Sequence, residues 1–251
     1  MRKVMIIAHR GANRDAPQNT MPAFSKACEL YADGVETDVH MTKDGHIVLC
    51  HNYTVDKTSD GKGQISDYML SQLLNLDFGS YFLSEFKNVR IPTIDDFFIF
   101  LKSKPIKLIN IEIKADRDKL KNKEIARKTI EAAKKYNLFD RLLISSFDGG
   151  TLVFAKEIDS ECKTGLLYPR ITKFFSDWMS PPLHYAHKIK ADTIHPMARF
   201  VDRQLIARAH RLGLLVNVWT VNSMKQAAEL VKMGADGIIT DCPFEIRTVV
   251  G

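Results

Sequence analysis

The feature that most constrains the fold is the regular alternation of short apolar runs with amphipathic segments, which continues almost to the end of the chain. Short apolar runs with β-branched residues, bounded by turn formers, are typical of buried strands. Eight such runs occur, at residues 4–8, 35–38, 108–113, 142–146, 164–167, 193–195, 215–219 and 237–240. The helical patterns between them cover residues 20–31, 94–103, 125–136, 150–158, 177–189, 202–212 and 223–233.

Eight β-then-α units within 251 residues predict an α/β fold, namely a (β/α)8 TIM barrel. A doubly wound open sheet is the alternative. Candidate site residues follow at least five of the predicted strands, whereas an open sheet concentrates its site at one switch point. We therefore expect residues 1–251 to form a single TIM-barrel catalytic domain.

The connection between the second and third predicted barrel strands is long, at roughly seventy residues, for an ordinary βα loop. It contains an apolar run at 47–50, a turn rich in Gly, Ser and Asp at 59–63, and a helical pattern ending near Phe86. We expect residues 52–90 to form a small insertion subdomain over the C-terminal mouth of the barrel.

The amino-acid composition limits the kinds of ligand that this protein is expected to bind. The formal net charge of +6 fits either a solvated lysine-rich surface or the attraction of anionic substrates. No run of Lys and Arg and no basic stripe interleaved with aromatic residues is present, so we expect no nucleic-acid binding. The four cysteines are scattered without a Cys-x-x-Cys pair, which predicts reduced thiols rather than a zinc or redox motif.

The sequence predicts neither a membrane span nor an export signal. No stretch approaches the roughly 18 apolar residues that a span needs. The apolar run at 4–8 is shorter than the core of a signal peptide, and His9 and Arg10 interrupt it. We therefore expect a cytoplasmic protein without stable membrane insertion.

Ionisable side chains stand at the ends of the predicted barrel strands. Glu36 and Asp38 share one face of the second strand because successive side chains point to opposite sides, and Glu112 and Lys114 share one face of the third. C-terminal strand ends converge on one pit, so the three carboxylates can meet there, where they repel unless protonated or bridged by a cation. All-oxygen ligation favours one hard divalent cation, Mg²⁺ or Ca²⁺. The alternative is a buried salt-bridge cluster with Lys114 and Arg10.

Two histidines flank these carboxylates. His9 follows the first predicted strand, and His51 follows the apolar run at 47–50. Histidine titrates near neutral pH and can act as a general acid or base. Arg10 and Lys114 supply fixed positive charge of the kind that binds phosphate. A histidine pair, a hard cation and phosphate-binding side chains together indicate phosphoester cleavage.

These residues belong to a series of motifs that extends along nearly the whole chain. The N-terminal motifs are His9-Arg10-Gly11, Pro17-Gln18-Asn19-Thr20, Glu36-x-Asp38, Thr42-Lys43-Asp44-Gly45 and His51. The later ones are Ile91-Pro92-Thr93, Asn110-Ile111-Glu112-Ile113-Lys114, Ser145-Ser146-Phe147, Val218-Trp219-Thr220-Val221-Asn222 and Gly234-Ala235-Asp236-Gly237-Ile238-Ile239-Thr240-Asp241. In this order and combination they resemble the signature of the glycerophosphodiester phosphodiesterases.

The resemblance implies a (β/α)8 barrel with a small insertion between its second and third units, and one divalent ion, often Ca²⁺ or Mg²⁺. It also implies roles for particular side chains: metal binding by Glu36, Asp38 and Glu112, acid–base catalysis by His9 and His51, and phosphate binding by Arg10 and Lys114. Three positions depart from the family pattern, which usually has Glu in place of Gln18, Asp in place of Asn52 and Arg in place of Lys57. These departures concern the metal preference and the protonation of His51, not the reaction class.

Several further side chains have two interpretations. Trp219 either walls the pit against the glycerol or packs the barrel, and Ser146 and His195 either touch the ligand or belong to the barrel. An apolar cluster after the fifth strand either begins a core-facing helix or forms a lip for the substrate's alcohol or an acyl chain; it consists of Phe174, Phe175, Trp178 and Met179.

We therefore expect a metal-dependent hydrolase of lipid and glycerol metabolism. Its small-molecule substrates are glycerophosphodiesters, and its products are sn-glycerol 3-phosphate and an alcohol. One alternative is lysophospholipase D-type action, which needs an apolar groove for an acyl chain. The other is a non-catalytic barrel that binds phosphoesters, which requires a lost acid or base, whereas both histidines are present.

Overall fold

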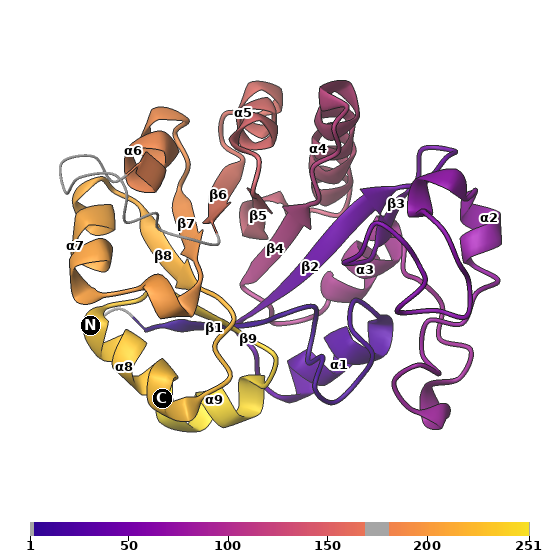
Figure 1. The fold of residues 1–251 in the computed structure, drawn as a ribbon, viewed down its shortest axis with the longest axis horizontal. Coiled ribbons are helices and arrows are strands. Elements are labelled where there is room, and N and C mark those ends of the chain that lie inside the picture. Colours follow the sequence, from indigo (N-terminus) through magenta and orange to yellow (C-terminus); the bar gives the residue numbers. More distant parts are fainter. Residues whose placement is uncertain (1–2, 169–180, 251) are drawn as a thin grey trace.

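Eight parallel strands close into a barrel in the computed structural model, which describes residues 3–168 and 181–250 (Figure 1). The barrel strands are β1 (Met5–Ala8), β2 (Gly34–Met41), β4 (Leu108–Ile113), β5 (Leu142–Ser146), β6 (Lys163–Tyr168), β7 (Thr193–Pro196), β8 (Leu215–Val218) and β9 (Gly237–Thr240). Strand β1 pairs with β9 on one side and with β2 on the other, which completes the ring. The predicted TIM barrel is therefore confirmed, and the open-sheet alternative is wrong.

Helices surround the strands (Figure 1). They are α1 (Met21–Glu29), α3 (Ile94–Leu101), α4 (Lys119–Lys135), α5 (Gly149–Ile158), α6 (Pro181–Lys188), α7 (Arg203–Arg211), α8 (Met224–Met233) and α9 (Pro243–Val250). Helix α9 has no counterpart among the helices predicted from the sequence. Helix α4 begins six residues earlier than predicted, at Lys119 instead of 125, because the Asp118 carboxylate accepts hydrogen bonds from the Leu120 and Lys121 amides and caps the first turn.

The alternation of side chains along each strand divides the apolar residues into two sets. Outward-facing side chains such as Val35 and Ile111 belong to the main core between the barrel and the helices. Inward-facing side chains fill the lower part of the barrel, and they are Ile7, Leu108, Leu143 and Ile239. Because the interior is packed at this level, a ligand can enter only from the end where the strands finish.

The segment between β2 and α3 begins with β3 (Ile47–Leu49), which pairs antiparallel with β2, and continues into a lobe beside α3 (Figure 1). The sequence predicted one helical stretch ending near Phe86, and that prediction is wrong. The lobe instead holds the four-residue α2 (Leu70–Leu73) and separate 3₁₀ turns at Ile65–Asp67 and Ser84–Phe86. The lobe has a small apolar core of its own, formed by Val48, Cys50, Val55, Ile65, Leu73, Phe78 and Ile91.

Three further predictions concern the chain as a whole. All four cysteines are free thiols, and three of them are buried. Within residues 3–168 and 181–250, no helix has both the length and the apolar character needed to cross a membrane. The apolar cluster from Phe174 to Met179 lies outside the described residues.

Candidate active site

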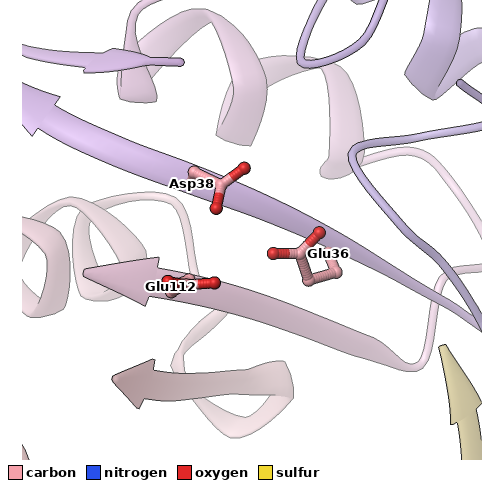
Figure 2. A group of neighbouring side chains, drawn as sticks. All are labelled: Glu36, Asp38 and Glu112. Carbon is pink, nitrogen blue, oxygen red and sulfur yellow. The ribbon is translucent and has the colours of Figure 1, made fainter. Parts of the chain in front are cut away.

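Three buried carboxylates lie together at the C-terminal end of the barrel. Glu36 and Asp38 project from the same face of β2, and Glu112 projects from the neighbouring β4, where it is the register partner of Asp38 (Figure 2). One oxygen of each residue lies within 4.8 Å of the others. The convergence inferred from strand alternation is therefore present in the structure.

Two cationic side chains contact this cluster. The ammonium of Lys114 lies 2.8 Å from Asp38 Oδ1 and 2.6 Å from Glu112 Oε1, and Arg10 Nε lies 3.5 Å from Asp38 Oδ2. Burial alone would raise the pKa of Asp38, but Lys114 and Arg10 hold it below its usual value. Asp38 therefore carries a full negative charge, and Lys114 lies between two of the carboxylates.

The two glutamates respond differently to the same environment. Burial, and then the charge of Asp38, raise the pKa of Glu112 to about 7 even though Lys114 opposes the change. Burial and the charges of Asp38 and Glu112 also raise the pKa of Glu36 well above its ordinary value. Three buried carboxylates with so much unfavourable negative charge form a donor set that fits a hard divalent cation.

The loop after β1 places Arg10 through an unusual backbone conformation. Arg10 has φ +56°, in the left-handed region, and its amide donates a hydrogen bond of 2.8 Å to Glu36 Oε2. The next residue, Gly11, has φ +78°, and a Cβ there would lie 2.7 Å from the backbone of Ala23. Arg10 Nη1 donates a hydrogen bond of 2.6 Å to Gln18 Oε1. The Gln18 side chain, which stands where the family pattern usually has Glu, therefore still holds the guanidinium.

His9 is held by a carboxylate from the other end of the chain. Its Nδ1 lies 2.6 Å from Asp241 Oδ1, at the end of β9. Asn13 Nδ2 and Asn222 Nδ2 also donate to Asp241, over 2.7 and 2.5 Å. Burial would raise the pKa of Asp241, but its hydrogen bond and charge interaction with His9 and the two amides lower it to about 2. The imidazole is thus fixed through Nδ1, which leaves Nε2 for other partners.

His51 has a neutral partner instead. Its Nδ1 lies 3.0 Å from Asn52 Oδ1, the second departure from the family pattern. Burial lowers the pKa of His51 to about 4; Asp38 opposes this, while Lys114 and Arg10 add to it. His51 is therefore neutral at pH 7 and able to accept a proton.

A cavity of about 140 Å³ joins these groups. Its charged side is formed by His9, Arg10, Glu36, His51, Glu112 and Lys114. Its apolar side is formed by Phe147, Leu167, Trp219 and Ile239. Asn110 and Ser145, on β4 and β5, complete the lining. A second, more open cavity adjoins His9 and Arg10 on the outer side and reaches Tyr81 and Phe82 of the lobe.

The remaining predicted side chains divide between the cavity and the barrel. Trp219 lines the cavity, packs against Phe147 at 5.8 Å between ring centroids, and donates from Nε1 to the His195 carbonyl over 2.7 Å. His195 itself is fully buried below, where its Nε2 contacts Thr193 and Asn217. Ser146 faces outward and donates to the Ile113 carbonyl, so it does not line this cavity.

Sequence reasoning assigned no role to several residues that the structure places at the site. Asn19 donates to Asp38 Oδ2 over 2.9 Å and accepts from Thr37, so it orients one carboxylate. Asp241 follows the apolar run of β9 directly, which is the same signal that identified His9. Side chains alternate along β5, so only one of Ser145 and Ser146 can point into the barrel. The sequence did not show which face of β5 points inward, and so it did not identify Ser145 as the cavity residue.

A TIM barrel with two histidines, two cations and three carboxylates around one small cavity is the arrangement of an enzyme that acts on a small anionic ligand. Comparisons with known proteins identify the family to which this enzyme belongs. A sequence model of the "Glycerophosphoryl diester phosphodiesterase family" matches residues 9–245. The chain therefore belongs to this family, a group of phosphoric diester hydrolases.

Individual relatives agree over nearly the full length. A glycerophosphodiester phosphodiesterase of Caldanaerobacter subterraneus subsp. tengcongensis is 38% identical over 248 residues, which cover 99% of this chain and 98% of the relative. The structure of an Oleispira antarctica phosphodiesterase in complex with the product sn-glycerol-3-phosphate matches with a TM-score of 0.88 at 28% identity, covering 98% of this chain and 96% of the other. A Silicibacter pomeroyi protein at 23% identity shares the fold, with a TM-score of 0.89 over 99% of this chain and 93% of the other.

Proposed function

We propose that this protein hydrolyses glycerophosphodiesters to sn-glycerol 3-phosphate and an alcohol, with His9 and His51 as the acid–base pair. The observation that carries the proposal is that both imidazoles line the same cavity as Arg10, Lys114 and two carboxylates of the cluster, those of Glu36 and Glu112. The product named for the Oleispira antarctica relative supports the substrate class.

Each charged group has a defined part in the proposed reaction. Arg10 and Lys114 bind the phosphate oxygens and offset their negative charge. One imidazole takes a proton from the attacking oxygen, and the other gives a proton to the alkoxide that leaves when its P–O bond breaks. Asp241 fixes the ring of His9, and Asn52 contacts that of His51.

The cluster of Glu36, Asp38 and Glu112 would hold one divalent cation, Mg²⁺ or Ca²⁺. Neutralisation of charge at a phosphate oxygen is what such an ion contributes when it is bound. The fit rests on the all-oxygen donor set, on the 4.8 Å spacing and on the raised pKa values of both glutamates. Lys114, which contacts two of these carboxylates, is the side chain whose contacts metal binding would change most.

The direct test measures release of glycerol 3-phosphate from glycerophosphoethanolamine, with and without a chelator. We expect chelation to abolish turnover and Mg²⁺ or Ca²⁺ to restore it. His9→Ala and His51→Ala should each lower kcat by roughly 10² or more while remaining folded. Full activity in a verified metal-free sample would refute the metal role, and a histidine variant with wild-type kcat would remove that residue from the mechanism.

Metal binding also has a readout that does not depend on activity. A ligand that binds only the folded state raises Tm in proportion to the logarithm of its concentration. We expect Mg²⁺ or Ca²⁺ to raise Tm of the wild type and to do so much less for Glu112→Gln. Glu124→Gln, on the exposed side of α4, is the matched control and should respond like the wild type.

The lysophospholipase D alternative is tested on the same enzyme. Within the described residues, the apolar side of the cavity consists of Phe147, Leu167, Trp219 and Ile239, and an acyl chain gains about 0.8 kcal/mol per methylene only where apolar surface covers it. We expect kcat/KM for glycerophosphodiesters to be at least about tenfold higher than for monomeric lysophosphatidylcholine. A better rate with the lysolipid would favour the alternative, and binding without any product would favour a non-catalytic barrel.

A further inference from the structure

Within residues 3–168 and 181–250, two side-chain oxygen atoms of the cavity lining have no hydrogen-bond partner. Asn110 Oδ1 and Ser145 Oγ are buried, and neither forms a hydrogen bond with any residue in the described parts of the chain. Both residues line the cavity. A buried polar atom without a partner is costly, so each of these atoms calls for a hydrogen-bonding group that the folded chain does not supply.

The position of the pair within the barrel indicates what that group is. Asn110 lies on β4 beside Glu36 of β2 in register, and Ser145 lies on β5 beside Glu112 of β4. On one side of the pair are the charged residues on or directly after β1, β2 and β4; on the other is the apolar wall that includes Leu167 of β6 and Trp219, which follows β8. The cavity thus changes from charged to apolar across these two side chains.

A ligand that fits this change from charged to apolar lining residues has an anionic group, a short carbon chain and a hydroxyl. With a phosphate against Arg10 and Lys114, the carbon chain would lie along the apolar wall and its hydroxyl would reach the junction. One hydroxyl can donate to Asn110 Oδ1 and accept from the Ser145 hydroxyl at the same time. A single alcohol group would therefore satisfy both unpartnered atoms.

We propose that Asn110 and Ser145 form a polyol subsite that recognises the terminal hydroxyl of the substrate's glycerol arm. This inference rests on the proposed function and deepens it by assigning substrate selection to two residues outside the acid–base and metal groups. A site built to hydrogen-bond a hydroxyl rejects the analogue that lacks it, because the buried polar groups are then left unpaired. Selection for glycerol over a deoxygenated arm thus follows from burial.

The test compares glycerophosphoethanolamine with the analogue in which propane-1,2-diol replaces glycerol, so that only the terminal hydroxyl is missing. We expect wild-type kcat/KM to favour the glycerol substrate by about tenfold or more. Ser145→Ala and Asn110→Ala should each reduce this preference to less than about threefold, mainly by slowing the glycerol substrate. Retained preference in both variants would overturn the proposal.

The neighbouring residue of β5 supplies a matched control. Ser146 points away from the cavity and donates to the Ile113 carbonyl, so Ser146→Ala should lower Tm but leave the preference unchanged. Ser145→Ala removes a hydroxyl that has no partner, and we expect its Tm to equal or exceed that of the wild type. Loss of preference in a stable variant then reflects recognition and not unfolding.

Three outcomes separate this inference from others. Calorimetric titration with Mg²⁺ or Ca²⁺ should give the same affinity for Asn110→Ala and the wild type; weakened metal binding with the preference intact would make Asn110 a metal ligand instead. If the wild type releases glycerol 3-phosphate but does not distinguish the two substrates, the subsite is refuted and the proposed function stands. If it cleaves neither, the proposed function fails, and calorimetry with glycerol 3-phosphate against propane-1,2-diol phosphate still decides on the subsite.

Discussion

His9 depends on a carboxylate that lies 232 positions away in the sequence. Asp241 fixes the imidazole through Nδ1, and two asparagines hold Asp241 in turn. A carboxylate at this position sets the tautomer of the ring and stabilises its protonated form. In the proposed reaction Asp241 would therefore be a positioning residue, acting through His9.

We expect Asp241→Asn to lower kcat by roughly 10² to 10⁴ with little change in KM, because an amide can hold the wrong tautomer of His9. Asp236→Asn is the matched control, since Asp236 pairs with His210 Nε2 over 2.8 Å just before β9, at the other end of the barrel. Equal kcat values for Asp241→Asn and the wild type would show that the contact is only structural.

Among the elements, the lobe between β3 and α3 is connected directly to the segment that carries His51. Its small core contains Val48 of β3, Cys50, which immediately precedes His51, and Leu73 of α2. The main core between barrel and helices is a separate cluster that does not include these residues. We therefore expect residues 52–90 to respond to mutation as a unit that controls the position of His51.

Leu73→Ala should lower kcat as well as stability, because a cavity in the lobe loosens the segment that carries His51. If the protein unfolds as one unit, the free energy of unfolding should fall by about 2–5 kcal/mol. If the lobe instead opens separately, hydrogen exchange of its backbone amides would detect that opening. Leu152→Ala in α5 is equally buried but belongs to the main core, and it should cost stability without a comparable loss of kcat at low temperature. Identical losses of kcat in both variants would argue against an independent lobe.

For the whole molecule, the buried histidine below the cavity makes folding depend on pH. Burial lowers the pKa of His195 to about 3, whereas an unfolded chain would titrate near 6.5. Between these values the unfolded state binds more protons, so stability falls as the pH drops from about 6.5 toward 3. The contribution is fully present above the unfolded value.

From pH 7.5 to 5.5, His195 alone should reduce the free energy of unfolding by about 1.4 kcal/mol. His195→Gln cannot titrate, so its stability should fall by that much less over the same interval. Urea unfolding of both proteins at the two pH values measures the difference. A pH dependence that is the same for variant and wild type would mean that His195 is already accessible to protons in the folded state.

Much of this protein was determined by local sequence pattern. The period-two alternation in residues 35–38 and 108–113 placed Glu36, Asp38 and Glu112 on one face, and eight β-then-α units specified the barrel around them. Strand alternation and apolar periodicity are properties of neighbouring residues, so they can be recognised without tertiary contacts. The motifs around these positions also identified the family, and the family comparison confirmed it.

Other features were decided only by the tertiary structure. The pairing of His9 with Asp241, the contact of Lys114 with two carboxylates, and the choice of Ser145 over Ser146 for the cavity depend on which strands are neighbours and how they are staggered. Closing the ring between β1 and β9 joins the two ends of the chain, and no local pattern carries that information. The sequence determines which chemical groups are available at the strand ends, whereas the barrel's closure and register determine which of them meet.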